Sequence, residues 1–71
     1  MEQQEARRIR GDLLDAFDIY KINVLYGIET ETDEEHREIL TWYQLMLSLP
    51  EDVSAYKETP GKIKHYLKQI Y

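Results

Sequence analysis

The spacing of apolar residues over the first third of the chain predicts a long helix. Five of them recur at intervals of 4, 4, 3 and 4 residues, which places them on one face of an α-helix. They are Ile9, Leu13, Phe17, Tyr20 and Val24. Charged residues fall mostly on the other side. The pattern predicts a helix over about residues 3–26.

Other apolar residues of this helix lie beside or away from that face. Leu14 and Leu25 widen it, while Ile19, Ile22 and Ile28 lie off it. Because apolar residues occur on more than one side, we expect the helix to need more than one packing partner.

Two glycines mark this helix. Gly11 lies inside the pattern and costs about 1 kcal/mol relative to Ala, which predicts either close approach of another backbone or a later helix start. Gly27 follows the last apolar turn, where a residue with positive φ ends a helix.

A second helix is predicted over residues 33–48. Thr32 and Glu35 have the spacing of a capping box, in which each side chain bonds the other residue's backbone N–H. Pro50 disfavours helical geometry at Leu49 and ends the helix. The predicted inward residues are Ile39, Tyr43, Met46 and Leu47, with Leu40 and Trp42 beside them.

The remaining chain predicts a connector and a short helix. Residues 50–59 show no long period, and this connector has room for one helical turn. Thr59 and Pro60 suit the N-cap and first position of a helix over residues 60–70. Its apolar face consists of Ile63, Tyr66, Leu67 and Ile70. The predicted fold is all-α, an antiparallel helical hairpin plus a short C-terminal helix, forming one small domain over residues 1–71.

Length and composition make this domain marginal. A chain of 71 residues without cysteine buries a small core and has no disulfide to stabilise it. We therefore expect a homo-oligomer or docking on a protein partner. There is no apolar run of transmembrane length and no signal-like N-terminus, so the expected location is the cytoplasm in which the chain is made, or an assembly built there.

Charge divides the chain into an acidic body and a basic tail. Residues 1–56 hold 13 acidic and 5 basic side chains, whereas residues 57–71 hold one acidic and four basic ones. The acidic balance disfavours direct nucleic-acid binding. The tail either pairs with the acidic body of its own chain or docks on an acidic partner surface.

No residue pattern predicts catalysis, a cofactor or a metal. The acidic cluster around residues 29–38 lacks the central glycine of a calcium loop. His36 and His65 have no Ser or Cys partner at a motif spacing. We therefore expect no enzyme activity, no cofactor and no metal ion.

The aromatic residues favour protein contact. Tyr20, Tyr43, Tyr66 and Trp42 fit inward faces, whereas three tyrosines fall at element ends or in the connector. These three are Tyr26, Tyr56 and Tyr71. Because tyrosine is enriched at interfaces, they are candidates for contact with another chain.

Three stretches together resemble small phage proteins. RRIRGDLL at residues 7–14, followed by Asp18, is similar to the opening of small tail-assembly proteins of bacteriophages. WYQLMLSLP at residues 42–50 resembles a segment of the same proteins. YKETPGKIKHYL at residues 56–67 is similar to the ending of short minor structural proteins in phages of Gram-positive hosts. The resemblance implies a non-enzymatic role in tail or baseplate assembly, with no active site. It also implies a location in the host bacterial cytoplasm or the virion.

Two hypotheses follow for the surface that acts. In the first, a phage or prophage protein contacts other tail proteins through its basic tail. The residues expected to make that contact are Tyr56, Lys62, Lys64, Tyr66, Lys68 and Tyr71. In the second, a small acidic inhibitor faces the basic groove of a host defence or nucleic-acid enzyme. Its acidic surface consists of Glu29, Glu31, Glu34, Glu35 and Glu38.

Overall fold

The computed structural model describes residues 3–48, 50 and 52–70, without the side chains of residues 53 and 68–70. The described residues form four helices and no strand, which confirms the all-α prediction. The helices are α1 (Gln3–Leu25), α2 (Asp33–Leu47), α3 (Val53–Lys57) and α4 (Gly61–Ile70). None of them is long and apolar enough to cross a membrane.

The predicted signals between α1 and α2 are present. Gly27 has φ of 76°, and its N–H donates to the carbonyl of Val24 at 3.1 Å, while Ile28 donates to Asn23 at 2.8 Å. These two bonds form a Schellman motif that ends α1. Both bonds of the capping box link Thr32 and Glu35. The sequence therefore fixes both ends of this loop locally.

The start of α4 differs from the prediction. The Lys64 N–H donates to the Pro60 carbonyl at 3.0 Å, so the helix begins at Gly61 rather than at Pro60. The buried hydroxyl of Thr59 does not cap α4. It donates to the Tyr56 carbonyl at 2.7 Å and accepts from Trp42 Nε1 at 3.0 Å. The Thr59 hydroxyl, which the sequence predicts to cap α4, is instead bonded to the Trp42 indole and to the Tyr56 carbonyl.

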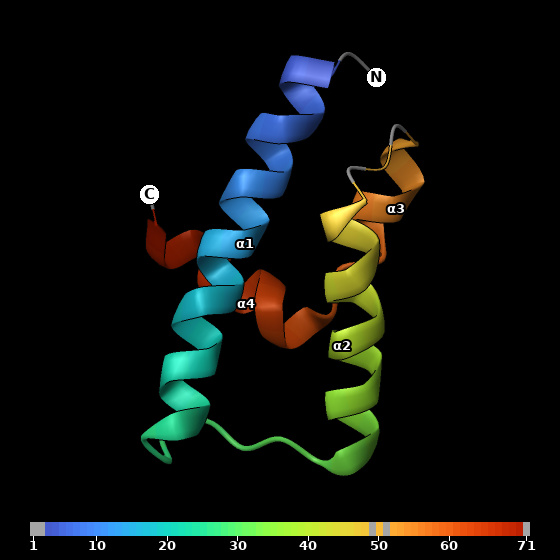
Figure 1. The fold of residues 1–71 in the computed structure, drawn as a ribbon. Helices are drawn as coiled ribbons and strands as arrows, with labels where there is room; N and C mark the ends of the chain where they lie inside the picture. The colour runs from blue at the N-terminus through green and yellow to red at the C-terminus, as the bar shows by residue number, and fades with distance from the viewer. Residues whose placement is uncertain (1–2, 49, 51, 71) are drawn as a thin grey trace.

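The helices form a flat arrangement (Figure 1). α1 and α2 run antiparallel, α3 lies beside the end of α2, and α4 crosses behind α1. The most extensive backbone contact between the described helices is that of α1 and α4. The buried apolar core is Ala6, Leu13, Ala16 and Tyr20 of α1, Ile39, Trp42 and Met46 of α2, Tyr56 of α3, and Ile63 and Tyr66 of α4. We call the side of the α1–α2 pair that these residues occupy the covered face.

The buried residues of α1 and α2 differ in part from the inward faces that the sequence predicts. In α1 the core takes Ala16 rather than Phe17, which is half-buried. In α2 it takes Trp42, while Leu47 is 55% exposed. The reason is tertiary packing, since the core side of α1 is the one that α4 covers and the core side of α2 is the one that places Trp42 against Thr59.

Gly11 meets neither of the two conditions predicted for it. The helix runs through it without interruption, and a Cβ built there meets nothing within 4 Å. No described part of the chain therefore requires a glycine at this position.

Candidate protein-interaction surfaces

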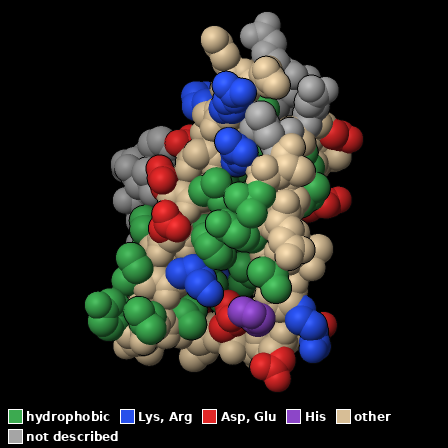
Figure 2. Space-filling view, in the orientation of Figure 1, with side chains coloured by type: hydrophobic (Ala, Val, Ile, Leu, Met, Phe, Trp, Pro, Cys, Tyr) green, Lys and Arg blue, Asp and Glu red, His purple; other side chains and the backbone are tan. Residues whose placement is uncertain are grey.

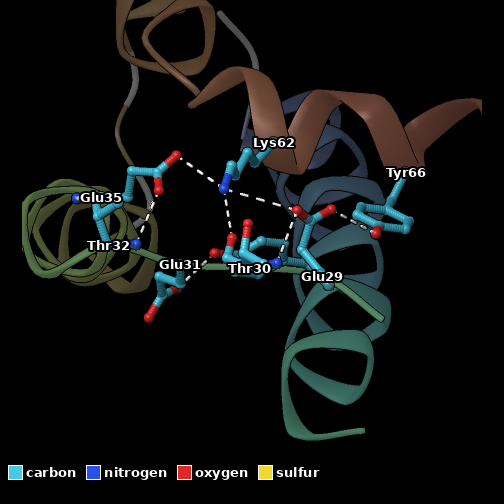
Figure 3. Close-up of polar contacts among 8 residues, drawn as sticks. Glu29, Thr30, Glu31, Thr32, Glu35, Lys62 and Tyr66 are labelled. Atoms are coloured by element: carbon cyan, nitrogen blue, oxygen red, sulfur yellow. Dashed lines mark hydrogen bonds and ion pairs between the residues drawn. The ribbon is translucent and has the colours of Figure 1, made fainter. Parts of the chain in front are cut away.

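The basic residue Lys62 joins α4 to the acidic loop and to the start of α2 (Figure 3). Its Nζ lies 2.9 Å from Glu35 Oε2 and 3.7 Å from Glu29 Oε1, and it also donates to the Thr30 carbonyl. The hydroxyl of Tyr66, one turn further along α4, donates to Glu29 Oε2 at 3.0 Å. We call Glu29, Thr30, Glu35, Lys62 and Tyr66 the clasp. The clasp fixes one end of α4 against the loop.

A second group of bonds anchors the loop to both long helices. Glu31 Oε2 accepts from the buried Tyr20 hydroxyl of α1 at 2.5 Å. Glu31 Oε1 lies 2.7 Å from Nδ1 of His36 in α2. The Glu31 side chain is only 12% exposed, so this carboxylate forms a connection between the helices rather than a free acidic surface.

The pKa shifts in the clasp all favour the charged forms. The hydrogen bond from Tyr66 holds the pKa of Glu29 below its ordinary value of 4.5. Bonds from the Thr32 backbone and from Lys62 lower the pKa of Glu35, and the bond to Glu35 raises that of Lys62. The clasp therefore contains an ionised lysine between two ionised carboxylates.

At Glu31 and Tyr20, burial and bonding act on the pKa together. Burial alone raises the pKa of Glu31, but hydrogen bonds from Tyr20 and His36 bring it below its ordinary value. Burial, followed by the bond to Glu31, raises the pKa of Tyr20. At neutral pH this pair is a neutral hydroxyl donating to a carboxylate.

The structure separates the residues that the sequence assigned to a partner contact. Tyr56 and Tyr66 are buried, and Tyr56 donates to the Pro50 carbonyl at 2.5 Å, so neither ring offers a free surface. Lys62 belongs to the clasp, and the exposed Lys64 donates to the Lys57 carbonyl at 3.1 Å. The side chain of Lys68 and all of Tyr71 lie outside the described residues.

The five carboxylates of the acidic hypothesis divide in the same way. Glu29, Glu31 and Glu35 are all held by bonds within the chain. Glu34 and Glu38 are exposed. The five residues are close together in the sequence, but only those that face α4 or Tyr20 form bonds within the chain.

Four of the large apolar side chains exposed in the described part of the chain surround the end of α1. Ile22 is 52% exposed, Leu25 79%, Tyr26 73% and Ile28 74%. We call these four residues the apolar cap. A shallow hollow of about 310 Å³ adjoins it and is lined by Lys21, Ile22, Val24 and Leu25. In Figure 2, hydrophobic side chains gather at the lower left, where α1 ends in Figure 1.

The sequence contains a signal for the apolar cap. Ile22 and Ile28 lie off the main apolar face of the first helix, and Tyr26 is among the tyrosines expected to contact another chain. Their exposure shows that the chain leaves this second side uncovered. Contiguous exposed apolar residues mark interaction sites in soluble proteins.

A second hollow lies between α2 and the end of the segment that contains α3. It has a volume of about 440 Å³ and is lined by Arg37, Glu38, Thr41, Trp42, Leu45 and Glu58. The hydroxyl of Thr41 donates to the Arg37 carbonyl of its own helix. Charges of both signs surround a small apolar floor, and no nucleophile–base pair is among the lining residues.

Metal chemistry has no support in the described part of the chain, where no three His, Asp or Glu side chains converge on a metal-sized site. No family model matches the chain, and no curated protein or solved structure is significantly similar to it.

Proposed function

We propose that this chain is a non-enzymatic phage or prophage protein that acts through protein–protein contacts in tail or baseplate assembly, with the apolar cap as its contact with another tail protein. The observation that carries the proposal is the exposure of four large apolar side chains within seven consecutive residues. Exposing them to water is unfavourable, and a partner surface that covers them removes that cost.

The composition and the fixed backbone of the apolar cap suit a contact that anchors a partner protein. Tyr26 combines a large ring with a hydroxyl, and such side chains supply much of the energy of protein interfaces. The Schellman motif at Gly27 fixes the backbone within the cap, and the bonds of Glu31 hold the loop that follows it. The cap is therefore presented on a fixed scaffold, which reduces the entropy lost on binding.

The setting in a phage tail rests on the resemblance of residues 7–14, 42–50 and 56–67 to small tail proteins. The alternative, a small acidic inhibitor of a host defence or nucleic-acid enzyme, has less support. Glu29, Glu31 and Glu35 are engaged within the chain and would have to break those bonds to face a basic groove.

The test is site-specific photo-crosslinking in phage-producing cells. A benzophenone amino acid replaces Tyr26, which is 73% exposed, and a control carries it at the exposed polar residue Gln44 of α2. We expect position 26 to crosslink to a tail or baseplate protein of the same phage, identified by mass spectrometry. Adding Ile22→Asp should reduce that product at least five-fold, whereas Gln44→Asp should leave it unchanged.

Two results would overturn the proposal. One is crosslinking of position 26 to a host nuclease or defence enzyme, which would support the inhibitor hypothesis. The other is equal labelling of tail proteins from positions 26 and 44, since this would show that the apolar cap has no special role.

A further inference from the structure

The α1–α2 pair has a second apolar side, opposite the covered face. In α1, Arg10, Leu14, Phe17, Lys21 and Val24 follow one another at intervals of 4, 3, 4 and 3 residues. In α2, Leu40, Tyr43 and Leu47 follow at intervals of 3 and 4. These intervals are those of heptad repeats, which are typical of a helix that packs along another helix.

This second side is open along much of its length. Leu40 is 46% exposed and Leu47 55% exposed, while Leu14, Phe17 and Tyr43 are half-buried. The rings of Phe17 and Tyr43 stack at 4.7 Å and link the two helices. Figure 2 shows hydrophobic side chains along the centre of this side, between α1 and α2. We call Leu14, Phe17, Leu40, Tyr43 and Leu47 the open seam.

We infer that the open seam binds the open seam of a second copy of this chain, with α1 of each copy packed antiparallel on α2 of the other. The resulting dimer is an antiparallel four-helix bundle in which α4 of each copy lies on the outside. This surface is distinct from the apolar cap, so the inference goes beyond the proposed function.

The dimensions of the molecule fit a dimer of this kind. It measures 37 × 27 × 15 Å over its Cα atoms, so it is flat, and the open seam lies on one broad face. A stable interface buries about 800 Å² on each partner, and a face of this size can supply it. The twofold dimer is also the most common assembly of identical chains, because one self-complementary surface is sufficient.

The charges beside the open seam select the orientation. Arg10 and Lys21 lie on the α1 side of the seam, and Asp33 and Glu34 are exposed at the start of α2. Antiparallel packing of α1 on the α2 of the second copy brings Lys21 near that acidic end. Packing of α1 on the other α1 would instead bring Lys21 near Arg10. Opposite charges therefore favour the first arrangement, and like charges disfavour the second.

The central experiment is sedimentation equilibrium of the full chain from 1 to 200 µM. We expect a monomer–dimer equilibrium in this range. Leu47→Glu and Leu40→Glu each place a charge in the seam and should weaken the dimer at least ten-fold. Thr41→Glu is the matched control, because this exposed residue lies in the same helix but on a side turned away from Leu40 and Leu47. Circular dichroism should show that each variant keeps its helices, since both leucines are exposed.

A charge exchange tests the orientation. Lys21→Glu should weaken the dimer three- to ten-fold, and adding Asp33→Lys should restore most of the loss. Three results would overturn the inference: a monomer at 200 µM, a Leu47→Glu variant that dimerises like the unmodified chain, or stronger dimerisation of Lys21→Glu. The cap variant Ile22→Asp should leave dimerisation unchanged, so the failure of this inference and that of the proposed function are distinguishable.

Discussion

Met46 and Leu47 are neighbours in α2, yet Met46 is fully buried and Leu47 is 55% exposed. Met46 belongs to the covered face, where α4 packs against the α1–α2 pair, and Leu47 belongs to the open seam. The residue types on the two sides are similar, so hydrophobicity does not explain the difference. The chain has only one α4, and a short helix can cover only one side.

The comparison also shows how α4 reaches the covered face. Lys62 and Tyr66 bond to the loop at one end of the hairpin, and Thr59 accepts from Trp42 just before α4 begins. In the part of the chain that the structure describes, the five side chains of the open seam make no hydrogen bond, and beside them Arg10 Nη1 lies 3.5 Å from the Met46 carbonyl. Polar bonds thus select which apolar side becomes the core.

The largest expected effect concerns the pair Met46→Ala and Leu47→Ala. We expect Met46→Ala to reduce the free energy of unfolding by about 2–5 kcal/mol, because it leaves a cavity in the covered face. Leu47→Ala at 1 µM chain should change it by about 0.5 kcal/mol or less. Urea denaturation followed by circular dichroism measures both. Equal losses in the two variants would mean that the faces do not differ as described.

A smaller effect is expected from Glu31, which anchors the loop. Its folded pKa lies below the ordinary value of 4.5, so its contribution is present above pH 4.5 and is lost as the pH falls through the folded pKa. Glu31→Gln should cost about 2 kcal/mol at pH 7, since it replaces a charged acceptor of the Tyr20 hydroxyl. The difference between the variant and the unmodified chain should shrink toward pH 3. A difference that stays constant between pH 7 and pH 3 would contradict this role.

The smallest expected effect concerns Gly11, which belongs to neither the covered face nor the open seam. Gly11→Ala should stabilise the chain by about 0.5–1 kcal/mol, because a Cβ there has free space and alanine favours the helix. Thermal unfolding at low concentration measures the gain as a rise in Tm of about 4–8 °C per kcal/mol. A loss of stability instead would contradict the free space around a Cβ at Gly11.

Much of the fold was predictable because its signals are local. The capping box of Thr32, the positive φ at Gly27 and the periods of the long helices each involve residues within a few positions of one another. The prediction for Thr59 was wrong for the opposite reason. Its hydroxyl bonds Trp42, 17 residues away, and no local pattern indicates that competition.

The interaction surfaces were predictable only in part. The sequence indicated that the first helix has apolar residues on more than one side, and that Tyr26 is a candidate for contact with another chain. It could not indicate that Tyr56 and Tyr66 are buried, because their burial depends on how α3 and α4 return to the core. It also could not indicate which of the five carboxylates are bonded within the chain and which are exposed, because their partners come from distant helices.

The sequence by itself determined the two long helices, the ends that flank the loop between them, and the acidic body and basic tail of the chain, because periodicity, capping and charge are properties of short segments. Only the tertiary structure decided that α4 covers one side of the hairpin, that Lys62 pairs with Glu35 of the same chain, and that the apolar cap and open seam stay exposed. Each of these depends on long-range packing, in which several apolar sides compete for one short helix.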